Sequence, residues 1–114
     1  MPHITLNTSQ KLSDAQKEKI KTELGRLITI IPGKTEAVTA VVFSDGRTMY
    51  KAGEIIDGAS VELRLFRKSE FEGKKKFTEE TFEMLIRELG IKSENLYLFI
   101  SEFEEWGGGS TLKT

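Results

Sequence analysis

Residues 60–66 read SVELRLF, a stretch in which an aliphatic residue stands at every second position from Val61 to Leu65. Successive side chains of a β-strand point to opposite faces, so this alternation predicts a strand with one face in a core. The positions in between include Glu62 and Arg64, which makes the opposite face unusually charged. The stretch therefore predicts a sheet that is covered by apolar packing on one side only.

A helix and a further strand are predicted to follow. The apolar residues that recur at helical spacing before Gly90 are Phe82, Leu85, Ile86 and Leu89. They predict one apolar stripe that ends at Leu89. Two residues are alternative N-caps for this helix. Ser69 begins a capping box, and Thr78 is flanked by aromatic residues in hydrophobic-staple positions. Residues 96–103, LYLFISEF, alternate again and predict a strand.

The N-terminal part of the chain shows the same order of elements. Residues 2–6 favour a short strand before a run of turn formers, and Ser13 begins a capping box for a helix that Pro32 stops. Residues 37–43 read AVTAVVF, which is typical of a buried strand. The segment 47–58 is less regular, and we expect a loop or a short edge strand there.

These patterns predict one α+β domain over residues 1–114, built from two βαβ units in halves of about 1–57 and 58–114. Crossover connections of this kind are right-handed, so both helices should lie on one face of a four-stranded mixed sheet. The opposite face would then expose Tyr97 and Phe99. Burial of these rings against other subunits would explain such a face, and we expect an oligomer.

The composition excludes several classes of function. The chain has 114 residues, and its 17 basic and 18 acidic side chains leave a formal net charge of −1. We therefore expect no binding to nucleic acids or to membrane surfaces. The sequence has no cysteine, which excludes disulfides and thiolate metal sites, and no stretch approaches about 20 apolar residues. We expect a soluble, cytoplasmic protein.

Pro2 is the residue with the most specific chemistry. Removal of Met1 would leave a secondary amine at the start of a strand, held in direction by its ring. Apolar neighbours and a nearby cation both disfavour the protonated amine and lower its pKa. Such an amine can act as a base at neutral pH. A retained Met1 would turn this nitrogen into an amide and abolish its basicity.

Two other residues near the chain ends have simpler explanations. His3, the only histidine, should point away from Pro2 because strand side chains alternate in direction. Trp106 precedes three glycines and should anchor the C-terminal tail by packing. Neither residue needs a catalytic role.

Short matches in the same order along the chain carry a resemblance to a known family. They are Met1-Pro2, Asn7-Thr8, Gly33-Lys34, Met49 with Gly53, Leu96-Tyr97 and Gly109-Ser110-Thr111-Leu112. With this order and spacing, the chain resembles the macrophage migration inhibitory factor group of the tautomerase superfamily over nearly its whole length. The resemblance implies the tautomerase fold and a homotrimer.

The resemblance also implies an activity and a site. It implies a keto–enol tautomerase that acts on 2-keto acids such as arylpyruvates and needs neither a metal nor an organic cofactor. Pro2 would be the general acid/base, and Lys34 would hold a substrate carboxylate or carbonyl oxygen. The backbone amide of Phe66 and the ring of Tyr97, contributed by a neighbouring subunit, would complete the pocket.

Several alternatives stay open. Phe99 stands where well-known relatives have a polar amide side chain, which favours a trimeric cytokine-like binding protein with an idle pocket. The start Met-Pro-His also resembles carboxymethyl-hydroxymuconate isomerases. Lys34 is also typical of a solvated residue after a helix stop. Arg64 and Arg67 are rival anion binders, although alternation of Glu62 and Arg64 favours a charge ring inside an oligomer.

Overall fold

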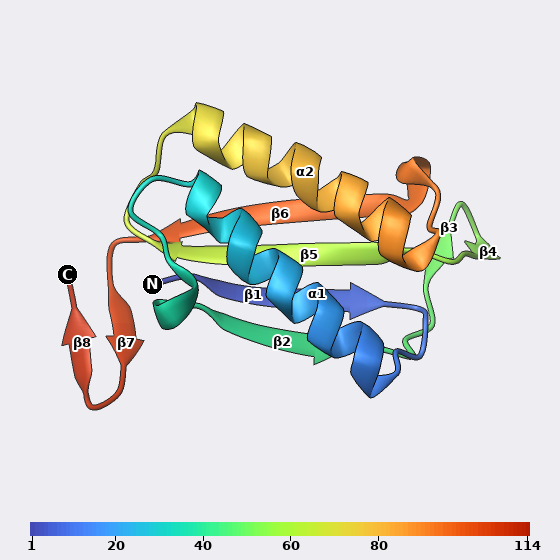
Figure 1. Cartoon of the computed structure of the whole chain (residues 1–114), viewed down its shortest axis with the longest axis horizontal. Coiled ribbons are helices and arrows are strands. Elements are labelled where there is room, and N and C mark those ends of the chain that lie inside the picture. Colours follow the sequence, from blue (N-terminus) through green and yellow to red (C-terminus); the bar gives the residue numbers. More distant parts are fainter.

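The computed structural model describes all residues from Met1 to Thr114. The long strands are β1 His3–Thr8, β2 Ala40–Ser44, β5 Ala59–Phe66 and β6 Leu96–Phe103. They form one sheet in the order β2-β1-β5-β6, and both helices cover the same face of it (Figure 1). The short strands form two hairpins, β3 Tyr50–Lys51 with β4 Glu54–Ile55 and β7 Trp106–Gly108 with β8 Thr111–Lys113. These hairpins lie at opposite ends of the sheet (Figure 1).

Strand pairing confirms the doubled βαβ arrangement and the mixed sheet. β1 runs parallel to β2, β5 runs parallel to β6, and β1 and β5 pair antiparallel in the centre. The central register places Ile4 opposite Leu63 and Thr5 opposite Glu62. Each unit is therefore a strand, a helix and a parallel strand, followed by a hairpin. The hairpin that ends the second unit is absent from the sequence-based expectation.

Helix α1, Asp14–Leu27, begins at the predicted cap. The Ser13 hydroxyl accepts a hydrogen bond from the backbone N–H of Gln16 at 3.1 Å, and the Gln16 side chain accepts one from the N–H of Ser13 at 2.9 Å. This reciprocal pair satisfies two N–H groups that a helix start leaves free. Short 3-10 turns lie at Ile28–Ile30, Glu36–Val38 and Ser93–Asn95.

Helix α2, Phe71–Leu89, begins at neither of its two predicted caps. Glu70 stands at the N-cap position, and the backbone N–H of Ser69 donates instead to the carboxylate of Glu102 on β6 at 2.6 Å. Thr78 lies inside the helix, where its hydroxyl donates to a carbonyl one turn earlier. The end of the helix is as predicted, because Gly90 takes the left-handed conformation with φ of 66°.

The core lies between the helices and the face of the sheet that they cover. Its fully buried side chains include Ile4, Leu6, Val61, Leu63 and Leu65 from the central strands and Ile20, Leu24, Phe77, Met84 and Leu85 from the helices. Removal of this apolar surface from water, at roughly 25 cal/mol per Å², is the main force that holds the layers together. Neither α1 nor α2 is long and apolar enough to cross a membrane.

Two strands differ from the sequence-based expectation. β1 continues through Asn7 and Thr8, because the Thr8 hydroxyl is fully buried and donates to the carbonyl of Gly58 at 3.0 Å. β2 begins only at Ala40 and lies at the edge of the sheet, so it is not a buried strand. Val42 is accordingly 43% exposed. An apolar run therefore predicted a strand correctly but not its place in the sheet.

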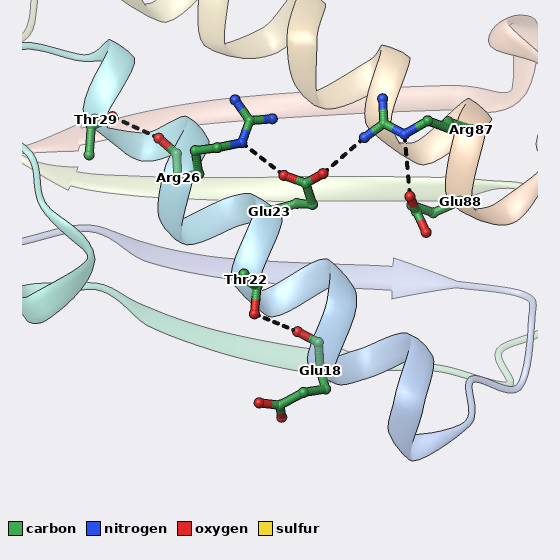
Figure 2. A network of polar contacts seen from close by, with 7 residues as sticks. All are labelled: Glu18, Thr22, Glu23, Arg26, Thr29, Arg87 and Glu88. Atoms are coloured by element: carbon green, nitrogen blue, oxygen red, sulfur yellow. Dashed lines mark hydrogen bonds and ion pairs between the residues drawn. The ribbon is translucent and has the colours of Figure 1, made fainter.

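Polar contacts tie the two helices together above the sheet (Figure 2). Glu23 of α1 accepts hydrogen bonds from Arg26 at 2.9 Å and from Arg87 of α2 at 3.1 Å. Arg87 also contacts Glu88 at 3.3 Å. The hydrogen bond from Arg26 is the main cause that lowers the pKa of Glu23, and the charge of Arg87 acts in the same direction. This contact stabilises the helix layer, whereas the opposite face of the sheet has no such cover.

Candidate functional site

Pro2 directly precedes β1 and so lies at the end of the sheet where that strand begins. The N-terminus marked in Figure 1 lies at this end, close to the β7–β8 hairpin. It is buried, and its carbonyl accepts a hydrogen bond from the N–H of Ala40 at 3.1 Å. This bond attaches the start of the chain to the edge strand β2. Met1 stays partly outside, with 36% of its surface exposed. The first residues therefore have a defined position against the sheet.

The amino group of Met1 lies in a positively charged environment. Burial is the largest cause that lowers its pKa below the ordinary value of 8.0, and the charges of Lys34 and Lys113 lower it further. Lys34 belongs to the loop after α1, where its N–H donates to the carbonyl of Ile31 at 3.1 Å. Gly33 makes this turn with φ of 82°, which a side chain would disfavour. The loop therefore places the charge of Lys34 where it acts on the Met1 amino group.

An open pocket of about 370 Å³ brings together two of the predicted site residues, Lys34 and Phe66. Its other lining residues are Pro32, Arg67, Lys68, Ser69 and Glu70. Arg67 has a left-handed backbone, with φ of 67°, and its N–H donates to the carbonyl of Phe103 at 2.7 Å. Its guanidinium lies over the ring of Phe66, 4.9 Å from the ring centroid. Arg67 is therefore a further cation on the wall of this pocket, with Lys34 and Lys68.

Tyr97 lies toward the other end of the sheet. The register places His3 opposite Arg64 on β5, while Tyr97 of β6 stands beside Ser60. Four residues separate Arg64 from Ser60, or roughly 14 Å at about 3.4 Å per residue. The ammonium of Lys51 lies 5.6 Å from the centroid of the Tyr97 ring. One chain therefore brings Lys34 and Phe66 together in a pocket that Pro2 does not line, and it leaves Tyr97 distant from them.

Arg64, the other candidate anion binder, is paired on the uncovered face of the sheet. Its guanidinium contacts one carboxylate oxygen of Glu62 at 2.7 Å. The side-chain amide of Asn7 donates to the other oxygen of the same carboxylate at 2.9 Å. Arg64 thus already has an anionic partner, and of the two arginines only Arg67 lines the pocket that contains Lys34.

His3 points to the uncovered face, as the alternation of strand side chains predicts. Pro2 and Ile4 on either side of it are buried, whereas His3 is partly exposed. Its Nδ1 atom is buried without a hydrogen-bond partner. With Arg64 and Trp106 it lines an open pocket of about 410 Å³. This pocket shares no lining residue with the one that contains Lys34.

The C-terminal hairpin returns to the start of the chain. The ring of Trp106 packs against Phe66 and Phe103, with centroids 6.4 Å and 6.0 Å apart, so this residue does anchor the tail. Lys113 lies on the partner strand of the hairpin, and its ammonium is 3.6 Å from the sulfur of Met1. No local sequence pattern predicts this contact, because it joins the two ends of the chain.

No protein-family profile matches the sequence, and no curated protein matches it in sequence. Solved structures do match its fold. MIF2 from Leishmania major is 22% identical, with a TM-score of 0.91 over 98% of this chain and 97% of that one. The macrophage migration inhibitory factor-like protein from Entamoeba histolytica is 18% identical, with a TM-score of 0.85 over 97% of each chain.

A third similar structure is not named as a macrophage migration inhibitory factor but has the same fold. Native fused 4-OT is 14% identical, with a TM-score of 0.83 over 96% of this chain and 94% of that one. At these identities the similarity establishes the arrangement of the backbone. The chain therefore has the tautomerase fold, as seen in the structures of macrophage migration inhibitory factor proteins and fused 4-OT.

Proposed function

We propose that the protein is a cofactor-independent keto–enol tautomerase that acts on 2-keto acids such as arylpyruvates and works in the cytoplasm. The observation that supports this proposal most is the lowered pKa of the Met1 amino group, next to Pro2, which is caused by burial and by the charges of Lys34 and Lys113. We expect the same surroundings to lower the pKa of the Pro2 nitrogen once Met1 is removed. A general base works best when its pKa lies near the working pH. An α-amino group has an ordinary pKa of about 8 and a lysine ammonium one of about 10.4, so the amine at the chain start needs the smaller decrease in pKa to reach that range.

The proposed reaction moves protons through the Pro2 nitrogen. After removal of Met1, the neutral secondary amine takes a proton from the enol oxygen of the substrate. The protonated amine then donates a proton to the carbon next to the carbonyl, which gives the keto form and restores the neutral amine. The reverse direction begins with removal of a proton from that carbon. A positioned acid/base group of this kind contributes roughly 100- to 10,000-fold to the rate.

Lys34 and Phe66 are the proposed substrate-binding residues of the same chain. Both line one pocket, so a carboxylate bound by the Lys34 ammonium would lie near the backbone of Phe66. Negative charge grows on the carbonyl oxygen as the carbon loses its proton. A fixed ammonium and a backbone N–H stabilise that charge, because they need not reorganise during the reaction.

In the proposed site, Tyr97 comes from a neighbouring subunit of a homotrimer. Tyr97, Phe99 and Phe103 leave 36%, 56% and 41% of their surface exposed on the uncovered face of the sheet. Packing of this face against two further copies would bury these rings and could bring Tyr97 of one copy to the Pro2 end of another. We expect sedimentation analysis to show a trimer, whereas a stable monomer at micromolar concentration would contradict this arrangement.

The decisive experiment follows the loss of phenylpyruvate enol by its absorbance, with protein whose N-terminus is defined by intact mass. Protein that lacks Met1 should catalyse ketonisation. The matched control is the same chain with Met1 retained, in which the Pro2 nitrogen is an amide, and we expect it to be inactive. Equal activity of the two forms would exclude the Pro2 nitrogen as the base.

A non-enzymatic binding protein is the second candidate, and one observation favours it. Phe99 is 56% exposed and offers no hydrogen bond where the resemblance implies a polar amide. Processed protein that forms trimers but does not act on phenylpyruvate or on other 2-keto acids would support this candidate. A carboxymethyl-hydroxymuconate-type isomerase would instead act on carboxymethyl-hydroxymuconate in the same assay format.

A further inference from the structure

Lys113 reaches the start of the chain from the β7–β8 hairpin. The register of the hairpin pairs it with Trp106, whose ring packs on the end of the sheet. The Lys113 ammonium lies 3.6 Å from the sulfur of Met1. A Cβ atom added to Gly108 would lie 3.9 Å from the terminal methyl carbon of Met1. The hairpin therefore forms a wall beside the first residue of the chain.

Lys34 and Lys113 are two cations from separate segments whose charges act on the Met1 amino group. Lys34 follows α1, while Lys113 belongs to β8, and the charges of both act on the amine at the start of the chain. Neither lysine takes part in an ion pair. Glu70 and Glu105 line the adjacent pockets but do not pair with either lysine. Both charges therefore remain available to an anionic ligand.

Met1 lies where the charges of Lys34 and Lys113 both act. Its sulfur contacts Lys113, and its amino group lies within the electrostatic influence of both lysines. Removal of Met1 leaves its space to a ligand bound at the Pro2 nitrogen. Such a ligand could place one anionic group at Lys34 and another at Lys113.

We propose that Lys113 is a second anchoring cation of the Pro2 site, and that the site prefers 2-keto acids with a second carboxylate group. This inference rests on the proposed function, because it assigns a substrate class to the same site. Lys34 holds the carboxylate next to the carbonyl, and Lys113 holds the distal one. A lysine ammonium is a compact charge on a flexible stem, so it can follow distal carboxylates at different spacings.

The proton transfers are the same for both kinds of substrate. One proton moves from the enol oxygen to the Pro2 nitrogen, and one moves from that nitrogen to the carbon next to the carbonyl. The distal carboxylate forms no covalent bond and changes no oxidation state. Lys113 is thus a substrate-binding residue, and its effect should appear mainly in KM.

The test compares kcat/KM for phenylpyruvate, which has one carboxylate, with kcat/KM for oxaloacetate, which has two. In protein without Met1, Lys113→Gln should lower kcat/KM for oxaloacetate roughly five- to tenfold, because a charge-assisted contact is lost. Both values are measured at a pH above the amine pKa of each variant, because loss of the Lys113 charge also raises that pKa. Under this condition the value for phenylpyruvate should change by less than about twofold. Lys113→Arg keeps the charge and should recover most of the loss.

Lys76→Gln is the matched control, because Lys76 is exposed on α2 and forms no ion pair. It should change neither value, and equal melting temperatures of the variants should show that folding is intact. An equal loss with both substrates after Lys113→Gln would overturn the inference, as would an unchanged kcat/KM for oxaloacetate.

Calorimetric binding of malonate and propionate separates this inference from the proposed function. If protein without Met1 acts on neither keto acid, the tautomerase proposal fails, and binding alone decides the role of Lys113. Tighter binding of malonate than of propionate, weakened by Lys113→Gln, would support the second anchoring cation. Equal binding of the two anions, or malonate binding that Lys113→Gln leaves unchanged, would overturn it.

Discussion

The two βαβ units of this chain repeat one architecture, yet they differ at the point where the first strand of each unit begins. In the first unit, Pro2 leads into β1 from the start of the chain, with Lys34 and Lys113 nearby. In the second unit, Gly58 leads into β5 within a continuous chain. Its N–H donates to the hydroxyl of Ser9 at 3.0 Å, and its carbonyl accepts from the N–H of Ser9 at 3.1 Å.

A fold built from two similar units can therefore hold a reactive group at the first strand of one unit only. A peptide group inside the chain satisfies its N–H and carbonyl through hydrogen bonds and does not titrate near neutral pH. A chain start has an amine instead, whose pKa responds to burial and to nearby charges. Because Lys34 comes from the first unit and Lys113 from the second, the charged surroundings of this amine require the whole fold.

The largest expected effect comes from a substitution that changes the base itself. Pro2→Gly in protein without Met1 should lower kcat/KM for phenylpyruvate about 100-fold or more, because the rigid secondary amine is lost. Ala59→Gly is the matched change at the start of the second unit and should leave kcat/KM nearly unchanged in folded protein. A similar loss in both variants would show that the two strand starts act through packing rather than through chemistry.

The next effect concerns stability at the start of the second unit. A Cβ atom at Gly58 would lie 2.9 Å from the backbone oxygen of Asn95, so Gly58→Ala should lower the free energy of unfolding by about 1–3 kcal/mol. Gly107→Ala is the control, because its Cβ would meet only the Leu112 side chain at 4.0 Å. Urea denaturation of the three proteins measures the difference. Equal stability would mean that the chain shifts at Gly58 without cost.

A third effect tests the charge beside the amine. The base must be neutral to accept a proton, so kcat/KM should rise with pH through the amine pKa. Lys34 lowers the pKa of the Met1 amino group, and we expect it to act in the same direction on the Pro2 amine after removal of Met1. Lys34→Gln should therefore raise the pKa of that amine and move the rising limb of the pH profile to higher pH. Lys113 remains as the other cation that acts on the amine, and Glu70 lines the pocket with Lys34.

Loss of the Lys34 ammonium should also raise KM about tenfold, because a charged contact to the substrate carboxylate is removed. Lys92→Gln is the matched control, since Lys92 follows α2 as Lys34 follows α1 and is exposed. It should change neither the pH profile nor KM. An unchanged profile in Lys34→Gln would contradict the assignment of Lys34 to the site.

The smallest expected effect concerns the contact that joins the helices of the two units. The pKa of Glu23 is lowered in the folded protein, so its contribution to stability is complete above the ordinary value of 4.5 and is lost as the pH falls toward the folded pKa. Glu23→Gln should lower the melting temperature slightly at neutral pH and reduce its acid dependence. Glu79→Gln, which breaks a pair within α2, should have a smaller effect.

Much of the fold could be predicted from local patterns. The alternation in residues 60–66 and 96–103 corresponds to β5 and β6, because one side of each strand packs under the helices. The Ser13 cap and the Gly90 stop of the two helices depend on hydrogen bonds and dihedral angles within a few residues. The start of α2 could not be predicted in this way, since the Ser69 N–H binds Glu102, a distant residue on β6.

The candidate site divides in the same manner. The resemblance pointed to Pro2, Lys34, Phe66 and Tyr97. The structure places Lys34 and Phe66 on one pocket, which the buried Pro2 does not line, and it leaves Tyr97 toward the other end of the sheet. The left-handed backbone of Arg67 and the approach of Lys113 to Met1 had no local signal. Their roles in binding, like that of Pro2 in catalysis, stay predictions that the experiments above can decide.

By itself, the sequence determined which segments form strands and helices and which face of each is apolar, because those properties depend on the spacing of neighbouring side chains. It also determined that a proline follows the first residue. The tertiary structure alone decided which cations surround that start of the chain and which sheet face stays uncovered. The reason is physical: the pKa of an amine and the exposure of a ring depend on atoms that the chain brings together from distant positions.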